Sequence, residues 1–229
     1  MGLVRMGIPE QLVIALASIN NCTAFVETGT FQGATTRWAA NHFAIVHTIE
    51  RSESLYIVQR ETLARLPGVT PHLGDSRTIL PGVVSGLGQQ RAVYWLDGHW
   101  SGGETAGEGD ECPVIDELAC LAERNEDIIL IDDARLFLCA PPHPHNPSQW
   151  PTIADVVSRI ARPGERFVQI VDDVIFIIPD KPALKQHLVE YCRGRANSFW
   201  REFAGNHPVQ TRESPVERLV AKVRRVWAA

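Results

Sequence analysis

The chain has 229 residues, a length that suits one large domain or one domain with an appendage. Its net charge of −5 argues against a general nucleic-acid binder, and its 45% hydrophobic content is ordinary for a globular protein. The cysteines are odd in number and form no CxxC pair, so we interpret them as buried or free thiols in a reducing compartment. The apolar run Leu12–Ala17 is too short to span a membrane and the start lacks a convincing signal pattern, so we expect a cytoplasmic protein.

The first half of the chain alternates predicted helices and strands. Helices are expected over residues 9–20 and 53–65, and strands over residues 24–28, 45–50 and 69–73. Helix 9–20 has two interpretations, a cover over a ligand site or simple core packing. Between the first strand and the next helix lies a glycine turn, in which Gly29 can adopt the backbone angles of a sharp strand exit. Free N–H groups at the helix start favour a polar or anionic ligand.

Two carboxylates lie near this turn. Glu50 ends the second predicted strand, where an acid is well placed to accept both hydroxyls of a ribose. Glu27 stands where the dinucleotide fingerprint GxGxxG would have its first glycine. A carboxylate there would repel a pyrophosphate, but it suits a ligand that carries an amine or a sulfonium group.

The stretch 27–36 resembles motif I of class I S-adenosylmethionine (SAM)-dependent methyltransferases, in the variant E-x-G-T-x-x-G-x-T-T. The resemblance implies SAM as the cofactor. It also implies a cofactor site that includes Glu27, Thr28, Gly29, Thr30, Gly33, Thr35, Thr36, Glu50 and Asp97. The alternative interpretation is an ordinary turn between a strand and a helix of an α/β protein.

Asp75 and Ser76 follow the third predicted strand. In the family that the chain resembles, an acid at this place contacts the adenine amine, and the next residue often helps. Both residue types also favour helix N-caps. The two roles do not exclude each other.

The second half continues the alternation, with strands at 92–96 and 127–131 and helices at 113–123 and 152–161. Asp97 and His99 follow strand 92–96, which is the usual site position in an open α/β sheet. A flexible, acidic, glycine-rich loop is expected at 101–112. A proline-rich loop at 141–151 cannot be a helix or a central strand, and long loops at this edge of a sheet are often binding loops.

Strands 167–171 and 174–178 are joined by two residues and must form an antiparallel hairpin. The alternation and the hairpin predict an α/β protein whose mostly parallel sheet ends in a reversed strand. The resemblance implies the Rossmann-like methyltransferase sheet, with strand order 3-2-1-4-5-7-6 and helices on both faces. We assign residues 1–180 to this methyltransferase domain.

In this topology the ends of strands 92–96 and 127–131 are adjacent, so Asp97, Asp132 and Asp133 are expected to converge beside the SAM methyl group. Three crowded carboxylates repel each other unless a cation or protons neutralise them. Ligation by oxygen atoms alone suits Mg²⁺ or a similar divalent ion, which would lower the pKa of a bound hydroxyl. The sequence therefore predicts a metal site at these residues.

The segments 95–103 and 131–137 resemble metal-dependent small-molecule O-methyltransferases, including the macrocin O-methyltransferase-like enzymes. Catechol-type members have a lysine near the fourth strand as base, whereas the nearest residue here is His99. His99 is a candidate general base, with Asp97 beside it as the second catalytic candidate. Its other interpretations are a partner that orients Asp97 and a structural histidine. His143 and His145 either join it or are exposed loop residues, and no paired Cys/His spacing supports zinc.

Residues 181–229 form a basic extension with ten Lys/Arg and four Asp/Glu, a net charge of +6 that leaves −11 in residues 1–180. Ser214–Glu217 is a capping box, and an amphipathic helical pattern follows it. This helix is expected either to pack on its own domain or to contact a second copy of the chain or an anionic surface.

Three functions compete at this point. The first is a SAM-dependent, metal-assisted methyltransferase that transfers a methyl group to a hydroxyl of a small molecule such as a sugar, a glycoside or another natural product. The second is a SAM- or nucleotide-binding module that acts through a partner without methyl transfer. The third, an NAD-dependent oxidoreductase, is disfavoured by Glu27 and the missing GxGxxG.

Overall fold

The computed structural model of the chain describes residues 7–103 and 105–206. The chain divides into two compact units after Val189, and the first unit contains the sheet. This division lies inside the last described helix, nine residues beyond the domain boundary expected at residue 180. The capping box at Ser214–Glu217 and its amphipathic helix lie outside the described residues, so their docking role stays a prediction.

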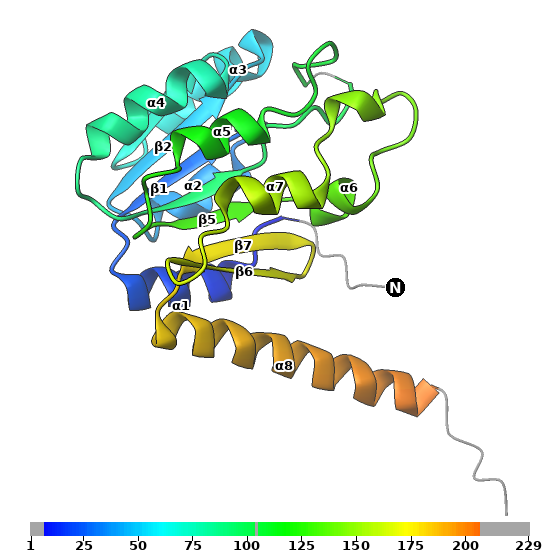
Figure 1. The fold of residues 1–229 in the computed structure, drawn as a ribbon. Helices are drawn as coiled ribbons and strands as arrows, with labels where there is room; N and C mark the ends of the chain where they lie inside the picture. Colours follow the sequence, from blue (N-terminus) through cyan, green and yellow to red (C-terminus); the bar gives the residue numbers. More distant parts are fainter. Residues whose placement is uncertain (1–6, 104, 207–229) are drawn as a thin grey trace, which may run out of the picture. The chain divides into compact units, whose positions relative to one another are not determined.

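Seven strands of the described chain form one sheet in the order β3-β2-β1-β4-β5-β7-β6 (Figure 1). The first five pair in parallel, whereas β7 is antiparallel to both β5 and β6. The predicted order and the reversed final pair are therefore confirmed. The strands are β1 Ala24–Thr28, β2 Ile45–Glu50, β3 Val69–Leu73, β4 Ala92–Leu96, β5 Ile128–Ile131, β6 Arg166–Val171 and β7 Val174–Pro179.

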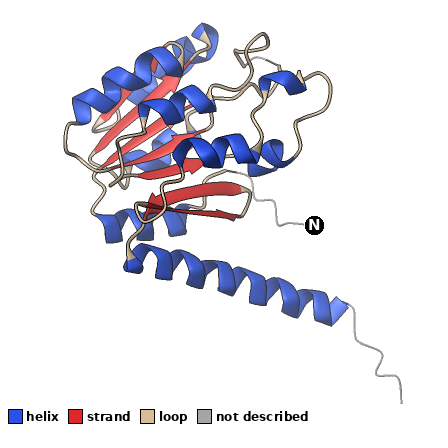
Figure 2. Ribbon diagram, in the orientation of Figure 1, coloured by secondary structure: helices blue, strands red, loops and turns tan. Residues whose placement is uncertain are grey.

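Helices cover both faces of the sheet (Figure 2). Leu80, Leu118 and Val156, from α4, α5 and α7, are buried in one core with Val26 and other residues of the sheet. On the opposite face the ring of Trp38 in α2 meets that of Phe25 edge to face, with 5.7 Å between centroids. The helices are α1 Glu10–Asn20, α2 Ala34–Ala40, α3 Glu53–Ala64, α4 Ser76–Leu87, α5 Val114–Cys120, α6 Ala134–Leu138, α7 Ile153–Ile160 and α8 Pro182–Asn206.

Polar side chains fix where two of these helices begin. The carboxylate of Asp75 accepts the backbone N–H of Arg77 at the start of α4. Thr152 and Asp155 form a reciprocal capping box at the start of α7. The helix expected over 113–123 begins at Val114 and ends earlier, at Cys120. Among the described residues, none of the helices is long and apolar enough to cross a membrane.

Strand β3 occupies one edge of the sheet, and Pro71 lies at its centre. The Gly74 N–H donates to the Glu50 carbonyl, and the Gly68 carbonyl accepts from the Val46 N–H. Backbone groups alternate in direction along a strand, so these bonds place positions 68, 70, 72 and 74 toward β2. Pro71 therefore faces the side of β3 on which no strand of the described residues pairs.

Candidate active site

A cavity of about 440 Å³ lies at the carboxyl ends of the parallel strands. Its lining includes Gly29 after β1, Glu50 at the end of β2, Asp75 and Ser76 after β3, and Asp97 and His99 after β4. The strand order reverses direction between β1 and β4, and ligands of open α/β sheets bind at such a switch point. The cavity lies at the edge where the sequence places the site, and the roles of the lining residues stay a prediction.

Gly29 allows β1 and β4 to approach each other at the floor of the cavity. Its φ of +82° lies in the left-handed region, and a Cβ atom at this position would overlap the carbonyl oxygen of Asp97. Because glycine has no Cβ, the chain can leave β1 directly beneath the end of β4.

Glu50 presents a fixed carboxylate to the cavity. Its Oε2 accepts the backbone N–H of Phe31 at 2.8 Å, and its Oε1 accepts the backbone N–H of Ser52 at 2.8 Å. These bonds orient both oxygens and leave each with acceptor capacity for a ligand hydroxyl. Glu50 is 6% exposed, so a hydrogen bond to a ligand would form with little competition from water.

Arginines surround the carboxylate of Asp75 at the β3 end of the cavity. Arg77 donates to it through Nε at 2.9 Å and through Nη2 at 2.6 Å, and Arg51 Nε lies 3.5 Å away. The hydrogen bonds from Arg77 hold the pKa of Asp75 below its usual value. Arg77 also pairs with Asp110, which ties the acidic loop to this end of the site. The sequence patterns did not place Arg51, Arg77 or Asp110 in the site.

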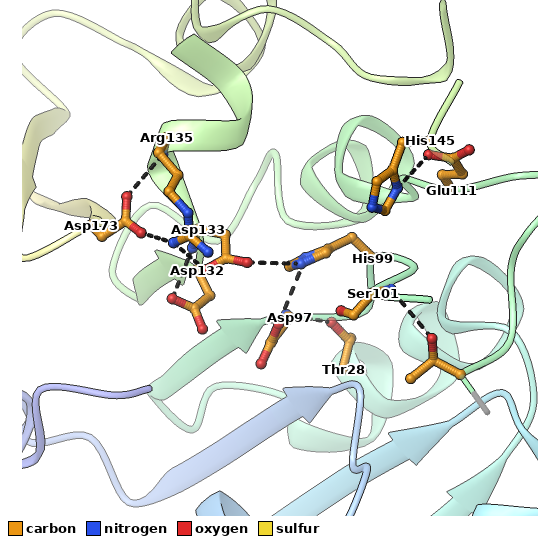
Figure 3. A network of polar contacts seen from close by, with 11 residues as sticks. Thr28, Asp97, His99, Ser101, Glu111, Asp132, Asp133, Arg135, His145 and Asp173 are labelled. Carbon is orange, nitrogen blue, oxygen red and sulfur yellow. Dashed lines mark hydrogen bonds and ion pairs between the residues drawn. The ribbon is translucent and has the colours of Figure 1, made fainter. Parts of the chain in front are cut away.

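His99 lies between two carboxylates at the other end (Figure 3). Its Nε2 is 3.2 Å from Asp133 Oδ2, and its Nδ1 is 3.7 Å from Asp97 Oδ1. Burial lowers the pKa of His99, but the hydrogen bond to Asp133 and the surrounding negative charges outweigh burial, so its pKa is raised overall. Asp133 is held in turn by Arg135 Nη1, 2.7 Å from its Oδ1. Arg135 also pairs with Asp173.

Two of the three predicted metal ligands, Asp132 and Asp133, already have other partners. Asp133 is occupied by His99 and Arg135, and Asp132 Oδ1 accepts the backbone N–H of Asp133 at 2.8 Å. No group of three or more His, Cys, Asp or Glu side chains within residues 7–103 and 105–206 is arranged to hold a metal ion. Asp97 and Asp132 nevertheless hold their protons more tightly than free carboxyl groups do. Burial and then repulsion by Asp133 raise the pKa of Asp132 to about 6, and burial with repulsion by its neighbours raises that of Asp97.

No protein-family model matches the sequence, and no curated protein matches it. Solved structures do match. A protein from Staphylococcus aureus assigned as a caffeoyl-CoA O-methyltransferase is 16% identical over 77% of this chain and 86% of its own, with a TM-score of 0.53. An O-methyltransferase from Bacillus cereus, solved in complex with S-adenosylhomocysteine (SAH), is 15% identical over 76% and 82%, with a TM-score of 0.50. A protein from Klebsiella pneumoniae assigned as an O-methyltransferase is 15% identical over 78% and 84%, also with a TM-score of 0.50.

The fold is that of the class I methyltransferases. The Rossmann-like sheet implied by the resemblance is thereby confirmed, together with its helices on both faces. On this fold, the predicted site residues lie in two layers. Those that line the cavity are Gly29, Glu50, Asp75, Ser76, Asp97 and His99.

The second layer lies beneath the cavity. Glu27 is buried and does not line the cavity. Its Oε2 instead accepts hydrogen bonds from the hydroxyls of Thr36 and Thr48, the latter at 2.7 Å. The Thr30 hydroxyl lies 2.5 Å from that of Thr48. Thr28 accepts the Asp97 N–H, whereas Gly33 and Thr35 lie at the start of α2; none of the three lines the cavity.

The buried carboxyl of Glu27 makes folding stability depend on pH. Burial raises its pKa to about 7 from 4.5, although hydroxyl donors partly offset the burial. Between pH 4.5 and about pH 7 the folded state therefore keeps a proton on Glu27 that the unfolded state has lost. The contribution of this proton to the free energy of unfolding is complete below pH 4.5 and is lost as the pH rises through 7. The loss is on the order of 3 kcal/mol.

We expect Glu27→Gln to melt at a higher temperature than the parent at pH 8, with the difference vanishing near pH 4.5. A control variant at the exposed Glu53, Glu53→Gln, should show no such trend, and a pH-independent difference for Glu27→Gln would contradict the assignment.

Proposed function

We propose that the chain is a SAM-dependent O-methyltransferase that acts on a hydroxylated small molecule, such as a sugar, a glycoside or another natural product. The observation that carries the proposal is one cavity lined both by a buried carboxylate, Glu50 at the end of β2, and by an imidazole, His99 after β4. The fold shared with O-methyltransferases supports it. The SAH in the B. cereus complex is the product that SAM leaves after methyl transfer.

The residues of the cavity suit SAM. Glu50 would accept the ribose hydroxyls, and Asp75 and Ser76 lie at the β3 end, where the resemblance implies adenine contacts. When bound, SAM supplies an electrophilic methyl group on its sulfonium. The contribution of the chain is to hold the acceptor oxygen in line with that methyl carbon.

His99 would accept the proton that the acceptor hydroxyl loses. In the tautomer whose Nε2–H donates to Asp133, the lone pair of Nδ1, which lies 3.7 Å from Asp97 Oδ1, would act as the base. Burial would raise the pKa of Asp133, but the hydrogen bond and charge of His99, followed by those of Arg135, lower it overall, and Arg135 also orients the carboxylate. Nδ1 of His99 would hold the proton that leaves the acceptor hydroxyl as that oxygen takes up the methyl group.

A divalent cation among Asp97, Asp132 and Asp133 is the second candidate for the activating group. The observation that favours it is the raised pKa of Asp97 and of Asp132, because a cation would relieve their repulsion. The observation against it is that His99 and Arg135 already occupy Asp133. Activation by His99 as the base does not require a metal, whereas activation by a cation does. Removal of metal ions with a chelator therefore distinguishes the two mechanisms.

Glu50→Ala is expected to weaken SAM and SAH binding by about 10- to 100-fold, because two hydrogen bonds to a buried charged acceptor are lost. Isothermal titration calorimetry with SAM, SAH and NAD measures this directly, and Glu53→Gln on the exposed side of α3 serves as the control. Unchanged affinity in Glu50→Ala would remove Glu50 from the site. Binding of NAD but not SAM by the parent protein would support a dehydrogenase, and SAM binding without release of SAH in the presence of acceptors would support a binding module.

A further inference from the structure

Glu111 joins two long loops beside the candidate site. Its Oε2 accepts Trp150 Nε1–H at 2.6 Å and lies 3.0 Å from His145 Nδ1, and its Oε1 accepts the Asn146 backbone N–H at 2.7 Å. The carboxylate is 1% exposed. These partners all lie in the proline-rich loop, whereas Glu111 ends the acidic loop. His145, which the sequence offered as a partner of His99 or an exposed residue, is thus bound to Glu111, and His143 is exposed.

Backbone bonds strengthen the same junction. The Trp100 N–H donates to the Glu111 carbonyl at 2.7 Å, and the Glu111 N–H donates to Gln149 Oε1 at 2.9 Å. Burial alone would raise the pKa of Glu111, but its hydrogen bonds from Trp150, Asn146 and His145 lower it, so the carboxylate is charged. A buried charged group that accepts several N–H bonds fixes the donors strongly, because each bond is charge-assisted.

The junction reaches the candidate base through Trp150. The indole ring of Trp150 meets the imidazole of His99 edge to face, with 5.4 Å between ring centroids. Trp150 is 6% exposed and packs on Phe137 of α6 as well. Its N–H points to Glu111 while its ring borders His99, so rotation of the indole would change the space available to the imidazole.

We propose that Glu111 is a positioning residue that sets the orientation of His99 through the indole of Trp150. The inference rests on the proposed function for its meaning, because it assigns Glu111 to the machinery of methyl transfer. Neither Glu111 nor Trp150 lines the cavity, so they would act on the base and leave cofactor binding unaffected.

NMR spectroscopy of the full chain at fixed pH tests the proposal. Glu111→Gln removes the charge, and Trp150→Phe keeps an aromatic ring but removes the N–H donor. We expect both variants to shift the His99 ring signals, and Glu111→Gln to shift the Trp150 indole N–H signal as well. SAH affinity by calorimetry should stay within about two-fold, because the ribose-binding side of the cavity is untouched.

Asp155→Asn is the matched control, since it weakens the capping box of α7, near the loop, without a contact to Glu111. It should leave the His99 signals in place. If Glu111→Gln moves the Trp150 indole signal but not the His99 signals, the proposal is wrong. Trp150→Phe carries the test if Glu111→Gln fails to fold, and unmoved His99 signals there also overturn it. Failure of the parent protein to bind SAH would refute the proposed function. The NMR result would still decide whether Glu111 sets the orientation of His99 through Trp150.

Discussion

His99→Asn is expected to reduce methyl transfer by about 100- to 10,000-fold, the range typical of a lost general base. Asparagine keeps a polar group of similar size but cannot take up the proton of the acceptor hydroxyl. SAM affinity should change by no more than about two-fold, because Glu50 and the β3 end of the cavity are untouched. The assay is SAH release, followed by mass spectrometry, with a panel of catechols, flavonoids and methyl glycosides as acceptors.

The same assay separates the base from a metal. If His99 acts without a cation, EDTA leaves the rate unchanged, and added Mg²⁺ does not raise the melting temperature. Asp132→Asn, which keeps the shape of a side chain that does not contact His99 directly, should then retain most activity. Activity that EDTA abolishes and Mg²⁺ restores, together with its loss in Asp132→Asn, would assign activation to the cation.

Gly29→Ala is expected to destabilise the fold by on the order of 2–5 kcal/mol, through a left-handed backbone and an overpacked contact. The added Cβ would overlap the Asp97 carbonyl oxygen and lie 2.8 Å from its carbonyl carbon. Because both are backbone atoms, β1 and β4 would have to separate beneath the cavity. SAM binding should fail along with stability.

Urea unfolding measures the effect, with Gly82→Ala as the control. Gly82 lies in α4 and lacks a positive φ, and apart from its chain neighbours and the nearby helix backbone, a methyl group added there would have no heavy atom within 4 Å. Alanine at this position should therefore be neutral or stabilising by up to about 1 kcal/mol. Equal unfolding midpoints for the two variants would show that the approach of β1 to β4 is not tight.

The strands were predictable to the residue where apolar runs meet turn residues. The run Ala92–Leu96 is buried throughout and ends at Asp97 and Gly98, so β4 appears in the sequence as it does in the structure. Helix α4 was not predicted, because Pro81 and two glycines interrupt its pattern. It forms nonetheless, since Leu80 and Val83 are buried in the core that covers the sheet.

Some residues of the candidate site were likewise predictable from the sequence, and others were not. Glu50 ends β2, and Asp97 and His99 come just after β4, so the sheet places them together whatever the loops do. The contacts of Glu111 with Trp150 and of Arg77 with Asp110 join residues more than thirty positions apart, through loops without a periodic pattern. No local signal specifies such pairs. The sequence likewise suggested three free carboxylates at Asp97, Asp132 and Asp133, because it does not show that Arg135 and His99 occupy one of them.

Pro71 limits how copies of this chain can associate. An open edge strand presents unpaired N–H groups that recruit strands of other molecules, which leads to fibrous aggregation. In β3 the outward positions are Val69, Pro71 and Leu73, and the central one has no N–H to offer. A foreign strand could therefore not complete a regular ladder along β3. One proline at the centre of a five-residue strand thus protects this rim of the sheet against edge-to-edge polymerisation.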